Sequence, residues 1–138
     1  MPTTNQSSPL EAFMTRDSSI SIDVATDYVD DQSDPDVDRY VFAYTITIAN
    51  DGDVAARLMS RHWVITDGNG KVQEVSGDGV VGEQPHLNPG EQFRYSSGAV
   101  LETPVGAMQG RYRMQADDGI DFDAPIPAFT LAVPGLLN

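Results

Sequence analysis

The chemically most suggestive pattern in the chain is a set of three closely spaced glycines. The segment GDGVVG has the spacing G-x-G-x-x-G, formed by Gly77, Gly79 and Gly82. In dinucleotide-binding folds this pattern joins a strand to a helix, whose free amides and dipole hold a pyrophosphate. No such helix is expected here, because Pro85 disfavours helical angles at Gln84. We therefore predict that the chain leaves Gly82 as extended backbone and does not bind a dinucleotide.

Two interpretations of this loop are compatible with its residues. Successive glycine amides can form a concave anion site without a helix, although Asp78 and Glu83 would flank that site with negative charge. The simpler interpretation, which we favour, is a tight loop between strands in which the glycines take positive φ. The candidate ligand or partner loop consists of Gly77, Gly79, Gly82, Glu83, Gln84 and Pro85. The candidate adjacent surface consists of Arg61, His62 and Arg94.

The two histidines of the chain offer little support for a metal site. His62 and His86 would have to meet, together with carboxylates such as Asp67, and no established metal-ligand spacing supports this. We predict instead that His62 is a half-exposed strand residue and that Trp63 lies on the opposite, buried face. Neither histidine has a motif serine near it for nucleophilic catalysis. We predict no catalytic residue and no metal ligand, and we favour a binding protein over an enzyme.

Five aspartates crowd the segment DDQSDPDVDR, residues 30–39. Their hard oxygen atoms could attract Mg²⁺ or Ca²⁺, but the segment lacks the glycine and the closing glutamate of a calcium loop. We expect an exposed loop with at most weak, salt-screened binding of divalent cations, and no cofactor.

The amino-acid composition limits which classes of protein and of ligand remain possible. A chain of 138 residues suits one domain, and the absence of cysteine excludes disulfides. The net charge of −13 repels the phosphates of nucleic acids. No apolar run is long enough for membrane insertion or resembles a secretion signal, so we expect a cytoplasmic protein. Aspartate is abundant and Lys71 is the only lysine, which suggests a salt-adapted source as a hypothesis.

Period-two alternation of apolar residues predicts strands along most of the chain, as at Ile20, Ile22 and Val24. The predicted strands are residues 19–28, 40–50, 56–67, 71–77, 91–101, 108–116 and 121–133. Pro125 and Pro127 place the last strand at a sheet edge. The pattern favours an all-β immunoglobulin or fibronectin type III-like sandwich of two antiparallel sheets with about seven strands, with a barrel as the alternative. Residues 1–17 are expected to be a mostly mobile tail with a weak helical pattern at 9–15, and residues 18–138 a single domain.

Four motifs occupy the middle of the chain, between residues 61 and 114: H-W-x-I-x-D-x-x-G, G-x-G-V-V-G-x-Q-P-x-L-x-P-G-E, Y-x-S-G and G-x-M-x-G-x-Y. These motifs resemble the ApaG family, and the flanking strands are compatible with it. The resemblance implies a fibronectin type III-like domain of bacteria, linked to cobalt resistance and magnesium efflux, with eukaryotic relatives that bind proteins.

The residues and the resemblance together predict a non-enzymatic interaction module. It would act in divalent cation (cobalt and magnesium) homeostasis through an unknown protein partner. The alternative is a binder or hydrolase of a phosphate-containing small molecule at the glycine-rich loop.

Overall fold

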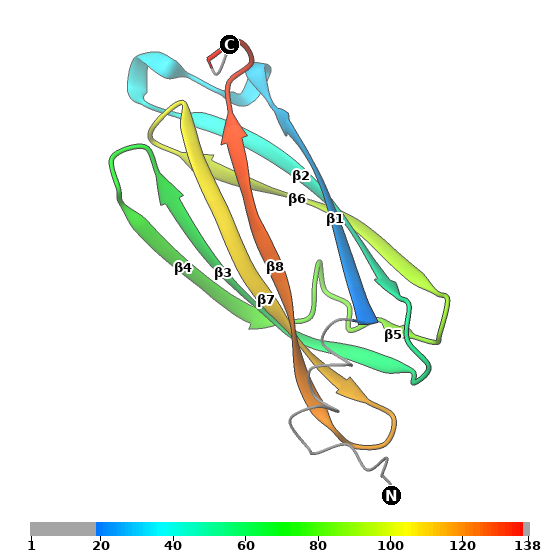
Figure 1. Cartoon of the computed structure of the whole chain (residues 1–138). Coiled ribbons are helices and arrows are strands. Elements are labelled where there is room, and N and C mark those ends of the chain that lie inside the picture. Colours follow the sequence, from blue (N-terminus) through cyan, green and yellow to red (C-terminus); the bar gives the residue numbers. More distant parts are fainter. Residues whose placement is uncertain (1–18, 137–138) are drawn as a thin grey trace, which may run out of the picture.

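The computed structural model describes residues 19–136, which form two facing antiparallel sheets (Figure 1). The predicted N-terminal tail, with its weak helical pattern, lies outside the described residues. The elements in chain order are β1 (Ile20–Tyr28), the 3₁₀ turns η1 (Asp30–Gln32) and η2 (Pro35–Val37), β2 (Tyr40–Asn50), β3 (Ala56–Asp67), β4 (Val72–Asp78), β5 (His86–Leu87), β6 (Gln92–Leu101), β7 (Val105–Ala116) and β8 (Asp121–Ala132).

The strand order confirms the predicted sandwich. One sheet has the order β1-β2-β6, and the other has the order β4-β3-β7-β8, with the short strand β5 paired to β3. The structure has eight strands rather than about seven, because the two-residue strand β5 carries no recognisable pattern of its own. β7 also begins three residues earlier than predicted, since Val105 pairs with Ala132 of β8. The aspartate-rich segment contains two short 3₁₀ turns where we expected only irregular loop.

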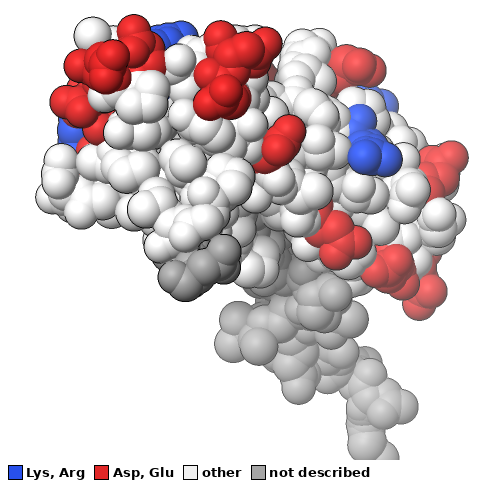
Figure 2. All heavy atoms as spheres, turned by 90° about the horizontal axis from the view of Figure 1, so that it is seen from above, with Lys and Arg blue, Asp and Glu red and all other residues white. Residues whose placement is uncertain are grey.

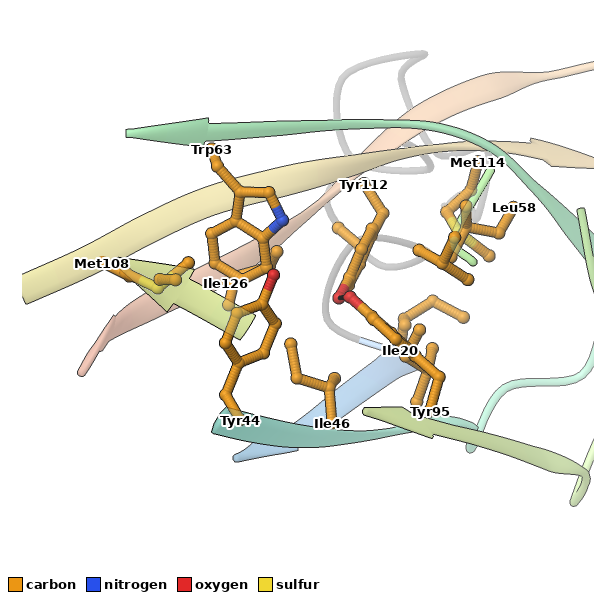
Figure 3. Close-up of a cluster of buried hydrophobic side chains, with 14 of the residues drawn as sticks. Ile20, Tyr44, Ile46, Leu58, Trp63, Tyr95, Met108, Tyr112, Met114 and Ile126 are labelled. Atoms are coloured by element: carbon orange, nitrogen blue, oxygen red, sulfur yellow. Dashed lines mark hydrogen bonds between the residues drawn. The ribbon is translucent and has the colours of Figure 1, made fainter. Parts of the chain in front are cut away.

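The alternation of side chains along each strand fills the space between the sheets. In β2 the residues Phe42, Tyr44, Ile46 and Ile48 are all buried, while the positions between them point to the outer face. Figure 3 shows Tyr44 of this sheet facing Trp63 of the other, with their ring centroids 5.5 Å apart. The core is therefore built from aromatic and aliphatic side chains that interdigitate across the two layers.

A pair of tyrosine hydroxyl groups crosses this core. The hydroxyl groups of Tyr95 in β6 and Tyr112 in β7 form a hydrogen bond, as their meeting in Figure 3 indicates. Burial raises the pKa of Tyr95 to about 12 and raises the pKa of Tyr112 further, because an ionised phenol would lose its hydration. The pair thus satisfies two buried polar groups and links the two sheets.

The edges of the sheets agree with the prediction from proline. β8, which contains Pro125 and Pro127, is the outermost strand of its sheet. The backbone N–H groups that these prolines lack are therefore not needed to pair two interior strands. No helix among residues 19–136 is long and apolar enough to cross a membrane.

Among the charged side chains at the end of the sandwich seen in Figure 2, acidic groups are more prominent than basic groups. The carboxylates form several separate groups between uncharged areas, and basic groups lie at two sides of the view. This distribution agrees with the net charge of −13.

Candidate functional site

The glycine loop, residues 77–85, joins β4 to β5 and ends in a tight two-residue turn. Val80 and Glu83 pair across the turn, with the amide of each donating to the carbonyl of the other. The two residues between them, Val81 and Gly82, have φ values of 44° and 82°. Two positive φ values in succession are typical of a type I′ hairpin turn, which favours asparagine and glycine at these positions. Glycine occupies the second position, but a β-branched residue occupies the first.

Val80 and Val81 have opposite environments although they are neighbours. Val80 is fully buried and fixes the loop to the core, whereas the side chain of Val81 is 54 % exposed at the tip. A β-branched residue at positive φ is strained by about 1 kcal/mol or more. The loop therefore holds an apolar side chain in solvent in a conformation that its own chemistry disfavours.

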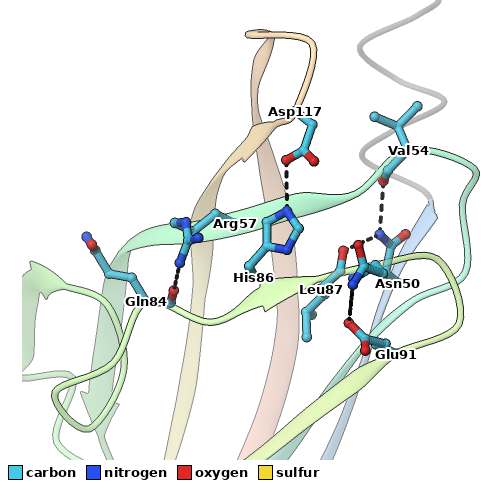
Figure 4. Close-up of polar contacts among 9 residues, drawn as sticks. Asn50, Val54, Arg57, Gln84, His86, Leu87, Glu91 and Asp117 are labelled. Carbon is cyan, nitrogen blue, oxygen red and sulfur yellow. Dashed lines mark hydrogen bonds and ion pairs between the residues drawn. The ribbon is translucent and has the colours of Figure 1, made fainter.

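Side chains of β3 fix the base of the loop. Arg61 Nη1 donates to the carbonyl oxygens of Asp78 and Gly79, at 2.9 Å each. Arg57 Nη1 donates to the Gln84 carbonyl at 2.7 Å (Figure 4). The side-chain amide of Gln84, through Nε2, donates to the backbone carbonyl of Met59 at 2.9 Å. These bonds make the loop a rigid extension of the sheet.

The first two glycines of the loop are required for two different reasons. At Gly79, where φ is 58°, an added Cβ would lie 2.2 Å from the Glu83 carbonyl oxygen. Gly77 does not have positive φ, contrary to our prediction for all three glycines. It lies in β4, and its missing side chain leaves room for the Arg61 guanidinium, 2.8 Å from the position of a Cβ.

Three backbone amides of the loop, those of Gly79, Val80 and Glu83, are bonded within the protein. Gly79 donates to the Met59 carbonyl, and Val80 and Glu83 donate to each other. Val81 and Gly82 are both left-handed, whereas an anion nest alternates between right-handed and left-handed residues. No helix follows Gly82, so the chain does continue as we predicted from Pro85. The geometry is that of a hairpin tip and differs from that of a phosphate cradle.

The candidate adjacent surface is divided between the two sheets. His62 and Arg61 lie in β3 beside the glycine loop, but Arg94 lies in β6, where its partner Thr47 is on the outer face of the other sheet. His62 is half-buried beside the fully buried Trp63, as predicted. Its Nδ1 is 2.7 Å from Ser76 Oγ, and its Nε2 is 3.0 Å from a carboxylate oxygen of Glu74.

The second histidine fixes the far end of the loop. His86 Nε2 lies 2.8 Å from Asp117 Oδ1, in the turn between β7 and β8 (Figure 4). The fully buried Asn50 donates to the carbonyls of Val54 and Leu87, at 3.0 Å each. The two histidines thus contact separate carboxylates, and residues 19–136 contain no group of three His, Asp or Glu side chains arranged to hold a metal ion.

Sequence reasoning missed three parts of this arrangement. The strain at Val81, the bond from Arg57 to the loop and the contact between His86 and Asp117 all depend on backbone angles or on residues distant in the chain. The one available signal was the V-G pair at the turn, because valine is unusual where asparagine is favoured.

The fold defines the class of the protein as a fibronectin-like sandwich of two antiparallel sheets that carries a rigid hairpin loop at one edge. The sequence profile described as the ApaG domain matches residues 30–116. The chain therefore belongs to the ApaG domain family.

Relatives and solved structures agree with this assignment. The chain is 66 % identical to the Protein ApaG of Azoarcus sp. (strain BH72) and 67 % identical to that of Thiobacillus denitrificans. Each alignment spans 119 residues and covers 86 % of this chain and 94 % of the relative. A crystal structure described as an ApaA protein from Bordetella pertussis is 52 % identical, with a TM-score of 0.82 over 84 % of this chain and 94 % of that chain.

Proposed function

We propose that this protein is a non-enzymatic interaction module that binds a protein partner through the glycine loop and thereby acts in divalent-cation homeostasis in the cytoplasm. The observation that carries the proposal is Val81, which is strained and exposed at the tip of a rigid loop. Asparagine or glycine would relieve the strain at this position. A valine there is explained if its side chain enters a pocket of another protein.

The rigidity of the loop supports recognition. Val80 is buried, and Arg57, Arg61 and Gln84 make bonds between the loop and β3, so little conformational entropy is lost when a partner binds. Full burial of a valine side chain in a partner pocket is worth about 1.5 kcal/mol. The link to cobalt and magnesium rests on membership in the ApaG family.

A capture experiment tests the role of Val81. Val81→Asn should relieve strain and also reduce the partner recovered from a lysate of the source organism several-fold. Val37→Asn is the matched control, because Val37 is also exposed and lies in η2, away from the glycine loop. We expect the control to recover the same partner as the unaltered protein. Equal recovery by the two variants would refute the assignment of the binding surface.

A growth experiment tests the cellular role. A strain that lacks the gene should be more sensitive to cobalt, and the unaltered gene should restore resistance. The Val81→Asn gene should restore less resistance at equal protein abundance, because the protein is folded but binds its partner weakly. Full restoration by this variant would separate cation homeostasis from the loop.

A further inference from the structure

The outer face of the larger sheet contains a groove beside the glycine loop. A depression of about 390 Å³ lies over the middle of β3 and β7 and the end of β4, and its walls include Arg111, Arg113, His62 and Arg61. A second depression of about 300 Å³ continues it toward β8 and shares His62 and Arg111. Both volumes reach the size of small-molecule sites in proteins.

Strand register explains why these side chains meet. Ser60 pairs with Arg113 of β7, and His62 pairs with Arg111. The two arginines alternate with the buried Tyr112 and Met114, so both point away from the core, roughly 7 Å apart along the strand. His62 also pairs with Ser76 of β4, which brings a second hydroxyl group to the floor of the groove.

One carboxylate orients both arginines. Asp123 of β8 lies 2.9 Å from the Nε of Arg113 and 3.7 Å from the Nε of Arg111. The 2.9 Å contact lacks hydrogen-bond geometry, so the buried Asp123 Oδ1 has no aligned donor. Within residues 19–136 the terminal amino nitrogens of both arginines have no other partner. The two guanidinium groups therefore present their terminal amino nitrogens, free of other partners, to the groove.

The distribution of charge makes this groove unusual for the protein. Three of the eight Lys and Arg residues of the chain line it, although the net charge is −13. Asp78 and Asp123 offset part of this positive charge, and Glu74 lies against His62. Arg111 and Arg113 are nevertheless gathered on one concave surface, where they can act on the same ligand, whereas Arg61 is bonded to the carbonyls of Asp78 and Gly79.

We propose that this groove binds the phosphate group of a small phosphate monoester. One guanidinium fork is enough for the two oxygens of a carboxylate, whereas a tetrahedral phosphate offers three terminal oxygens and can accept from two forks at once. The hydroxyl group of Ser60 provides a further donor beside the arginines. The apolar side chains of Val64 and Pro125 in the adjoining depression would contact the organic part of the ester.

Titration by NMR tests this proposal. Phenyl phosphate, inorganic phosphate, acetate and an acidic peptide should each be added at constant ionic strength, with the backbone amides and the arginine Nε–H groups observed. We expect phenyl phosphate to saturate shifts at Arg111, Arg113 and His62, with an affinity at least about tenfold above that of acetate, which corresponds to about 1.4 kcal/mol. Inorganic phosphate should bind at the same residues but more weakly.

Variants distinguish fork recognition from general attraction of anions. The double variant Arg111→Gln/Arg113→Gln should abolish the saturable shifts, and Arg111→Lys/Arg113→Lys should retain only a weak response. Arg94→Gln, on the other sheet, is the matched control and should bind phenyl phosphate normally. All substituted side chains are exposed, so a thermal melt should show that each variant is folded.

Several outcomes would overturn the proposal. Shifts that do not saturate, or that persist in the glutamine double variant, would show general anion attraction only. Shifts confined to the amides of the glycine loop would place the phosphate there instead. Tighter binding of the acidic peptide than of phenyl phosphate would identify a protein surface. None of these outcomes depends on Val81, so this test is independent of the capture experiment.

Discussion

The glycine loop and the aspartate-rich segment are both exposed connections with sequences that suggest ion binding, but they are stabilised in opposite ways. The side-chain hydrogen bonds between the glycine loop and β3 join residues 17 to 27 positions apart. The side-chain bonds of residues 29–41 join residues at most eight positions apart. The glycine loop also buries Val80, whereas η1 and η2 bury no residue.

The two regions also place different residues in the same backbone conformation. Asp38 at the end of η2 has a φ of 55°, and Val81 has a φ of 44°. Aspartate adopts left-handed angles with little cost, but a β-branched residue does so only under constraint. The comparison shows that the aspartate-rich segment follows its local preferences, whereas tertiary bonds impose the conformation of the glycine loop.

The largest effect that would test this contrast is expected at Gly79. Gly79→Ala should lower the free energy of unfolding by about 3 kcal/mol, because it combines positive φ with a clash at the Glu83 carbonyl. Gly82→Ala is the matched control, since Gly82 also has positive φ but no atom lies within 4 Å of an added Cβ. The Gly82→Ala variant should lower the free energy of unfolding by about 1 kcal/mol. Equal costs in urea unfolding would show that the turn relaxes freely.

A smaller effect is expected from the arginines. Arg61→Gln removes two charged donors from the loop carbonyls and should destabilise the protein by about 2 kcal/mol. It should also accelerate hydrogen exchange at the loop amides. Arg39→Gln, which removes one exposed bond of 3.3 Å to the Gln32 carbonyl, should cost less than about 0.5 kcal/mol. A larger loss from the Arg39 variant would contradict the contrast between the regions.

Relief of strain should give a gain in stability. Val81→Asn should raise the free energy of unfolding by about 1 kcal/mol, because asparagine tolerates positive φ. Asp38→Asn, at a similar φ, should change it by less than about 0.5 kcal/mol. Chemical denaturation measures both values. A destabilised Val81 variant would show that valine is locally favourable and would weaken the proposed function.

The smallest effect should be seen with Mg²⁺. We expect shifts in the aspartate-rich segment with an affinity of about millimolar, and none in the glycine loop. Sodium chloride at about 1 M, where the Debye length is about 3 Å, should abolish these shifts. Saturation at micromolar Mg²⁺ would instead indicate a formed metal site, and NMR titration at two salt concentrations distinguishes the two results.

Much of the fold could be predicted because its signals are local. Alternation in β2 follows from the pleat, and the edge position of β8 follows from Pro125 and Pro127. The absence of a helix after Gly82 follows from Pro85. The strand β5 was missed because two residues have no periodicity, and its formation depends on pairing with Ala56 and Arg57.

The candidate sites depended more on tertiary structure. Period two already put Arg111 and Arg113 on one face, but only the register with β3 put Ser60 and His62 beside them. In the same way, Arg61 could be named from the sequence as a neighbour of the glycine loop, but its bonds to the loop carbonyls could not.

The sequence by itself determined which segments are extended, which face of each strand is apolar and where the chain must turn, because backbone preference and side-chain period act between near neighbours. Only the tertiary structure decided which strands pair, that Val81 is forced to positive φ and that two arginines share a groove. These features arise from contacts between residues far apart in the chain, whose partners are selected by the packing of the whole core.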